Sequence, residues 1–190
     1  MRIEAEAENH NIMVNWKPFL LGPIFRQQGF QNSPFNSFPR KRDYMWRDIE
    51  RCCAALGLTF TRPEIFPGNG LYAARLALIG AEHGWVANFT KAVFEAYFGH
   101  GADLSDVDML KSVLSTVTTD DVEMLWDGAM SSGNKERLRQ QTEHADALGI
   151  FGAPTFIPST QGIRDEEATL EMFWGNDRLE AALALEAPHP

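Results

Sequence analysis

Two adjacent thiols are the first residues in this sequence that could do chemistry. Cys52 and Cys53 are its only cysteines. In the helix that the surrounding pattern predicts, neighbouring side chains point about 100° apart, so the two cannot act as a Cys-x-x-Cys redox pair. We therefore expect structural thiols. Since the sequence shows neither a secretory leader nor a disulfide framework, we expect a cytoplasmic protein in which they stay reduced.

Polar residues near the C-terminus are candidates for binding an anion. Asn176 and Asp177 stand where a predicted strand becomes a helix. Free amides at a helix start favour a carboxylate, and the Asp177 carboxylate can pair with an ammonium group. Either residue can equally serve as a simple helix cap. Asn32 and Lys41, in a loop rich in glycine and proline, are unremarkable on their residue types alone.

Composition excludes two classes of partner. The formal net charge is -9, and the only basic cluster, residues 40–42, is typical of a solvated turn. Nucleic acid is therefore not expected as a partner. No apolar run approaches the roughly 18 residues of a membrane span, so we expect no membrane association. We also predict no metal site.

The predicted elements fall into three blocks along the chain. A helix over residues 1–10 and a strand over 12–19 come first, followed by a long loop over 20–42. Asp43 is then predicted to cap a helix that Gly57 ends. The remaining predicted helices span residues 71–83, 85–98, 105–117, 119–130 and 135–148. Strands at 150–157 and 170–174 form a hairpin, and a last helix points Leu179, Ala182 and Leu183 inward.

This order predicts an α/β fold, a thioredoxin-like domain with an inserted all-helical subdomain and without its first β-strand. The thioredoxin-like domain would comprise residues 1–42 and 149–190, and the helical insertion residues 43–148. The absent strand would lie inside the sheet, so the strand at 12–19 would lack its neighbour.

Several motifs, in the same order along nearly the whole chain, resemble one family. The two sharpest are the segments 151–156 (FGAPTF) and 173–179 (FWGNDRL). Further support comes from the segments 18–25 (PFLLGPIF) and 32–34 (NSP), and from Lys41 followed by Tyr44. These segments resemble the 2-hydroxychromene-2-carboxylate isomerase family, which is similar to kappa-class glutathione transferases and DsbA-type oxidoreductases.

The resemblance implies glutathione as cofactor and gives the candidate residues their roles. Pro154 would follow a cis peptide bond and leave the backbone of Ala153 free to pair with the cysteinyl part of the ligand. Asn176 and Asp177 would hold its γ-glutamyl group. Asn32 and Lys41 would contact the remainder of the tripeptide from the loop.

The family's catalytic serine has no counterpart in the sequence, since its position would fall upstream of Met1. The implied activity is glutathione-dependent cis-trans isomerisation of 2-hydroxychromene-2-carboxylate-type aromatic catabolites. The alternatives are a kappa-like glutathione transferase and a catalytically inactive truncated homologue. A small aromatic carboxylate would be the substrate, and a homodimer is common in the family.

Overall fold

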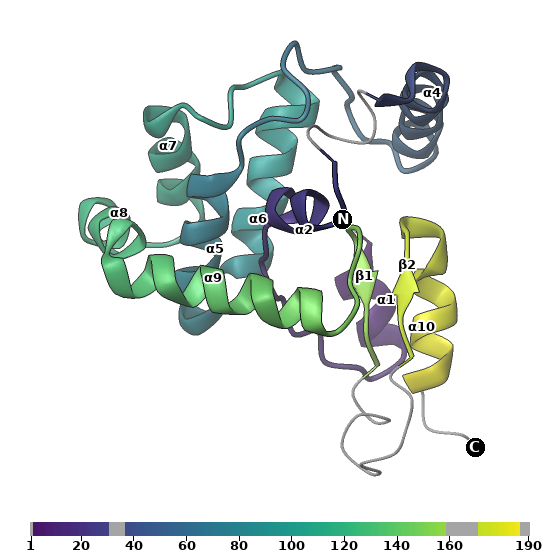
Figure 1. Cartoon of the computed structure of the whole chain (residues 1–190). Coiled ribbons are helices and arrows are strands. Elements are labelled where there is room, and N and C mark those ends of the chain that lie inside the picture. The colour runs from purple at the N-terminus through teal and green to yellow at the C-terminus, as the bar shows by residue number, and fades with distance from the viewer. Residues whose placement is uncertain (1, 31–36, 159–170, 187–190) are drawn as a thin grey trace. The chain divides into compact units, whose positions relative to one another are not determined.

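The computed structural model describes residues 2–30, 37–158 and 171–186 (Figure 1). The chain forms two compact units. Unit 1 consists of residues 1–15 and 147–190, and unit 2 of residues 16–146. The division of the sequence into residues 1–42, 43–148 and 149–190 stays a prediction.

Unit 1 places two helices against a short hairpin. Its elements are α1 (Ile3–Asn9), β1 (Thr155–Phe156), β2 (Phe173–Trp174), the 3-10 turn η2 (Asn176–Arg178) and α10 (Leu179–Glu186). Strands β1 and β2 are antiparallel, with Thr155 opposite Trp174 and Phe156 opposite Phe173. Ala7, Leu179 and Leu183 form the buried centre, and Ile12, Val14 and Phe156 pack against it.

Unit 2 is entirely helical within the described residues. Its elements are α2 (Leu21–Gln27), α4 (Pro39–Ala55), α5 (Leu71–His83), α6 (Val86–Phe94), the π-helical turn η1 (Glu95–Gly99), α7 (Val107–Val117), α8 (Val122–Met130) and α9 (Ser132–Ala147). Helices α5, α6, α7 and α8 pack together around Leu76, Phe89, Leu110 and Leu114, which are 0–1% exposed.

Local sequence explains where several of these helices begin and end. The Asp106 carboxylate accepts hydrogen bonds from the amides of Asp108 and Met109, at 2.9 and 3.2 Å, and so caps α7. Asp121 caps α8 through the amide of Met124 at 3.0 Å. Gly84, in the left-handed conformation with φ 81°, ends α5.

The predicted strand over residues 12–19 is wrong. Ile12, Val14 and Trp16 are half-buried while Met13 is 92% exposed, so the side chains do alternate. No other segment of the described chain pairs with this backbone, so the stretch forms no strand. Alternation predicts which side chains are covered, but a strand also needs a hydrogen-bonded neighbour.

The predicted loop over residues 20–42 is also wrong in part, because α2 lies inside it and α4 starts within it. Two prolines of this stretch sit in the first turn of a helix, Pro23 in α2 and Pro39 in α4, where no intrahelical amide bond is lost. Asp43 therefore lies inside α4 and does not cap it. Gly57, with φ 65°, does follow the end of that helix as predicted.

The other predicted helices are confirmed, with ends that differ by up to three residues when the segment predicted over 85–98 is compared with α6 and η1 together. The hairpin is confirmed too, although each strand is only two residues long. Leu179, Ala182 and Leu183 are buried, as the spacing of the last helix predicts.

Candidate functional site

The hairpin of unit 1 brings two of the sequence motifs together. The amide of Gly175 donates to the carbonyl of Pro154 at 3.0 Å, which extends the pairing of β1 with β2 by one bond. Ala153 and Pro154 therefore lie beside the turn that carries Asn176 and Asp177. Four of the six residues predicted from the sequence thus belong to one compact unit.

A glycine lets the two motifs approach this closely. A Cβ atom on Gly152 would lie 2.2 Å from the indole Nε1 of Trp174, closer than two such atoms can come. The rings of Trp174 and Phe151 meet with centroids 5.0 Å apart and planes inclined at 59°. The hydroxyl of Thr155 donates to the carbonyl of Gly152 at 2.7 Å and fixes the turn. Only glycine fits at position 152 without a shift of the indole.

Ala153 presents an open backbone edge. The Ala153–Pro154 peptide bond is cis, as the sequence predicts, and both residues are exposed. Within the described chain, no hydrogen bond engages the amide or the carbonyl of Ala153. The amide can therefore donate to an extended peptide, and the carbonyl can accept from it, in the manner of an added strand.

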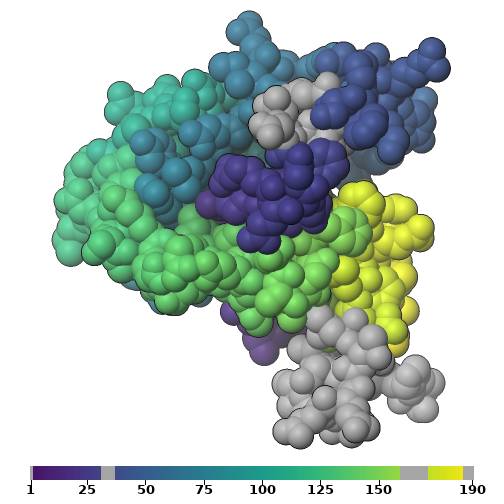
Figure 2. All heavy atoms as spheres, viewed as in Figure 1, coloured from purple at the N-terminus to yellow at the C-terminus, as the bar shows by residue number. Residues whose placement is uncertain are grey.

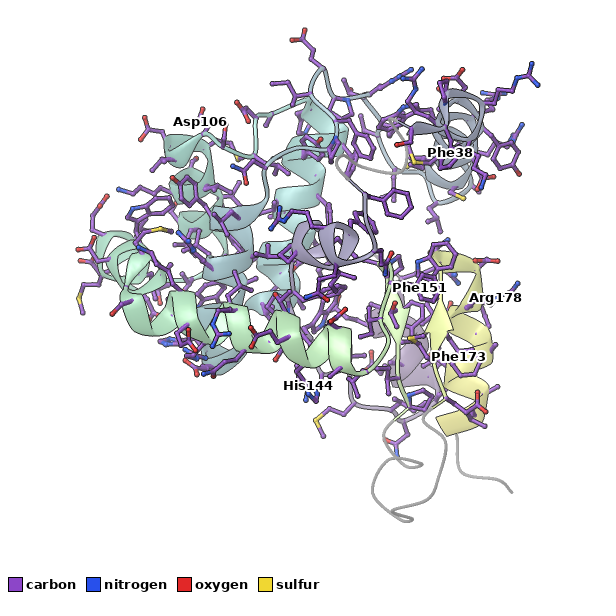
Figure 3. The ribbon with its side chains drawn as sticks, in the orientation of Figure 1. Phe38, Asp106, His144, Phe151, Phe173 and Arg178 are labelled. Carbon is purple, nitrogen blue, oxygen red and sulfur yellow. The ribbon has the colours of Figure 1, made fainter. Side chains whose placement is uncertain are left out.

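Asn176 and Asp177 project from the turn that leads into α10. Gly175, with φ 113°, makes this turn, and the side chain of Asp177 is 75% exposed. Its carboxylate lies 3.6 Å from the guanidinium of Arg178, whose side chain is more than half exposed. Figure 3 labels Phe151, Phe173 and Arg178 on this unit. The Asp177 carboxylate is thus open to a ligand ammonium group.

Arg2 supports this turn, a role that no pattern in the sequence indicates. Its guanidinium donates to the carbonyl of Asn176 at 2.6 Å and forms an ion pair with Glu180 on α10. The hydrogen bond from Arg2 holds the pKa of the Glu180 carboxyl below its usual range. No spacing rule connects residues 178 positions apart, so only the fold shows the contact. The Phe151–Trp174 ring pair was missed for the same reason.

The other two predicted site residues are not part of this group as described. Asn32 lies outside the described residues. Lys41 lies in the first turn of α4, in unit 2, where it is exposed and its ammonium stands 5.2 Å from the centre of the Phe38 ring. Figure 3 shows Phe38 at the start of that helix.

The Cys53 thiol of α4 is unsuited to nucleophilic chemistry. Both cysteines are free and half-buried. Burial, and to a lesser extent the neighbouring Cys52, raise the pKa of the Cys53 thiol, so it stays protonated at neutral pH. Among the described residues, no group of three His, Cys, Asp or Glu side chains is placed to hold a metal ion. None of the helices described is both long and apolar enough to cross a membrane.

The sequence of the chain is similar to those of known enzymes. The chain is 29% identical over 182 residues to the 2-hydroxychromene-2-carboxylate isomerase of Pseudomonas putida, covering 94% of this chain and 81% of that protein. It is 24% identical to glutathione S-transferase kappa 2 of Caenorhabditis elegans, covering 87% of this chain and 75% of the relative.

A solved structure has the same fold. A 2-hydroxychromene-2-carboxylate isomerase superposes with a TM-score of 0.79 at 22% identity, covering 97% of this chain and 84% of the other. The family model of the DSBA-like thioredoxin domain matches residues 1–185. The predicted thioredoxin-like fold is therefore confirmed, and the chain belongs to the DSBA-like thioredoxin domain family.

Proposed function

We propose that this protein is a glutathione-dependent cis-trans isomerase acting on 2-hydroxychromene-2-carboxylate-type aromatic catabolites. The observation that carries the proposal is the junction of unit 1, where the open backbone of Ala153 lies beside Asn176 and Asp177. The names of the relatives supply the reaction class. We propose further that the protein works in the cytoplasm as a homodimer.

The groups of this junction fit a γ-glutamyl tripeptide. Ala153 offers one amide donor and one carbonyl acceptor, both without a partner in the described chain, which matches the backbone of a cysteinyl residue. Asp177 offers a carboxylate for the α-ammonium group of the ligand. Asn176, at the start of the η2 turn, offers amide groups for the α-carboxylate. We assign the remaining contacts to Asn32 and Lys41.

Bound glutathione would supply a thiol whose reversible addition to a conjugated double bond permits rotation about it. The residues of this chain would hold and orient the tripeptide. The rings of Trp174 and Phe151 would stabilise the turn. Their contact fixes the position of Gly152 and hence the direction of the Ala153 amide. Positioning of this kind lowers the barrier by restricting the motion of the reactants.

Two measurements on the purified protein test the proposal. Calorimetric titration with glutathione should give a saturable heat, and Asp177→Asn should weaken the affinity about tenfold by removing a charge-assisted contact. Glu171→Gln, in an exposed residue two positions before β2, is a matched control. Isomerisation of the hydroxychromene carboxylate should then require catalytic amounts of glutathione only. Absence of heat at millimolar glutathione would refute the binding step.

A kappa-like glutathione transferase is the second candidate, favoured by the Caenorhabditis elegans relative. Both activities would use the same junction. Product analysis separates them, because a transferase consumes one glutathione per turnover whereas an isomerase returns it. If the protein binds glutathione but performs neither reaction, the third candidate, a catalytically inactive homologue, would stand.

A further inference from the structure

Unit 2 contains a cavity of its own between α2, α5 and α9. Its volume is about 230 Å³. Apolar side chains from all three helices line it, among them Ile24, Leu71 and Leu138. Figure 2 shows the atoms of α2 and α9 side by side on the face toward the viewer. Every residue that lines the cavity belongs to unit 2, so its shape does not depend on unit 1.

Hydrogen bonds fix the walls of this cavity. The amide of Leu20, just before α2, donates to the hydroxyl of Thr142 on α9 at 3.2 Å. That hydroxyl donates in turn to the carbonyl of Leu138 at 2.8 Å. In the amide orientation that satisfies both groups, Gln27 donates to the Asp146 carboxylate at 2.6 and 3.2 Å. Helix α2 is therefore tied to α9 at both of its ends, and the cavity is preformed.

The charged side chains around the cavity differ between its two ends. Near the C-terminal end of α9, the Asp146 carboxylate accepts hydrogen bonds from the neutral Gln27 amide, and Glu143 forms an ion pair with Arg139. At the other end, Arg75 and Lys135 have no carboxylate partner in the described part of the chain. The cavity thus carries unmatched positive charge at the end where α9 begins, which is also the positive end of that helix dipole.

Arg75 and Lys135 belong to the same end of the cavity. The Asn134 side chain, next to Lys135, donates to the backbone carbonyl of Arg75 at 3.0 Å and joins α5 to the start of α9. The guanidinium of Arg75 donates to the sulfur of Met130 at 3.5 Å and lies 6.0 Å from the centre of the Tyr72 ring, and its buried Nε has no hydrogen-bond partner in the described chain. A buried donor without an acceptor is costly unless a ligand supplies one.

We propose that this cavity binds a small monocarboxylic acid with an apolar body. The carboxylate lies at Arg75 and Lys135, and the body lies against Ile24, Leu71 and Leu138. Pockets for drug-sized ligands measure about 300–1,000 Å³, so this smaller cavity suits a ligand with one ring. The site does not rest on the proposed function, because it uses none of the residues assigned to glutathione.

Phenylacetate is a suitable probe, titrated into the whole protein and followed by calorimetry and by amide chemical shifts. We expect saturable binding with shifts confined to α2, α5 and α9. The neutral 2-phenylethanol should bind at least about tenfold more weakly, since it lacks the charge. Equal affinity for the alcohol, tighter binding of the cation phenethylamine, or no binding of phenylacetate would each overturn the proposal.

Variants test the two cations separately. Arg75→Gln and Lys135→Gln should each weaken phenylacetate binding about five- to tenfold, as loss of one charge-assisted contact does. Lys17→Gln, in an exposed lysine of the same unit that does not line the cavity, is the control and should bind as the parent does. Because Lys135 is exposed, its variant should fold even if Arg75→Gln does not. Unchanged affinity in folded Lys135→Gln would refute the assigned carboxylate position.

Discussion

The two units of this molecule are held together in different ways. Unit 2 buries large apolar side chains from four helices, and Phe89, Leu76, Leu110 and Leu114 lose nearly all contact with water. In the described part of unit 1, the buried cluster is small, Ala7, Leu179 and Leu183, and the sheet has strands of two residues. Its geometry depends more on close backbone contacts, such as Gly152 against Trp174, than on a deep core. The geometry of the candidate junction thus does not need a large core, but a single added atom at Gly152 is expected to disturb it.

The largest expected effect is on the core of unit 2. Phe89→Ala should lower the free energy of unfolding by about 3–5 kcal/mol, because it removes a fully buried ring that packs edge-on to Trp85. Urea unfolding followed by circular dichroism of the helices measures this. Phe94→Ala, in a half-exposed ring of the same helix, is the matched control and should cost much less. Equal costs would contradict a core centred on Phe89.

A smaller change should have a more local effect in unit 1. Gly152→Ala introduces a Cβ that must displace the Trp174 indole, and overpacking of this kind costs about 1–3 kcal/mol. We expect a shifted tryptophan fluorescence maximum and a loss of glutathione affinity. Gly133→Ala, where an added Cβ meets nothing within 4 Å, is the control. Unchanged glutathione affinity in Gly152→Ala would show that the turn does not position the ligand.

The helix caps of unit 2 give a third, moderate effect. Asp106→Ala should lower the free energy of unfolding by about 1 kcal/mol, as loss of a cap to the amides of Asp108 and Met109 typically does. Asp108→Ala, two residues after Asp106 in the first turn of α7, removes a carboxylate that caps no helix in the described chain. Thermal unfolding of both variants compares them, and an equal loss would show that charge at the helix start, rather than capping, is responsible.

The smallest effect concerns the Arg2–Glu180 contact of unit 1. Its hydrogen bond holds the pKa of Glu180 below the usual range of a glutamate. A lowered pKa means that this carboxylate favours the folded state above its unfolded pKa, and that the gain is lost as the pH falls through the folded pKa. Titration of the Glu180 carboxyl by NMR should give a low midpoint, and Arg2→Met should raise it. An unchanged midpoint would mean that the contact does not persist in solution.

Much of unit 2 could be predicted from sequence because helix signals are local. Asp121 and Gly84 mark helix boundaries within a few residues of the atoms they contact. The prediction of a loop around Pro23 was wrong because proline interrupts a helix only in its interior. In the first turn, where Pro23 lies in α2, it is tolerated. The prediction of a strand over residues 12–19 failed because strand pairing depends on residues elsewhere in the chain. Alternation of apolar and polar residues carries no information about them.

In the candidate site, too, local features could be predicted from the sequence and long-range contacts could not. Ala153, Pro154, Asn176 and Asp177 could be found from two short motifs, each of which holds its residues within a few positions. That the hairpin brings the motifs together follows from the pairing of β1 with β2. Arg2 and the Phe151–Trp174 ring pair could not be predicted, since their contacts join positions that no local rule relates.

The central claim is that the hairpin junction of unit 1 binds glutathione, and amide chemical shifts test it most directly. Titration of the labelled protein with glutathione should move the amides of Ala153, Asn176 and Asp177 in saturable fashion. The amides of α7 and α8, which hold none of the proposed ligand contacts, should stay in place. Shifts confined to unit 2, or no shifts at millimolar glutathione, would contradict the claim.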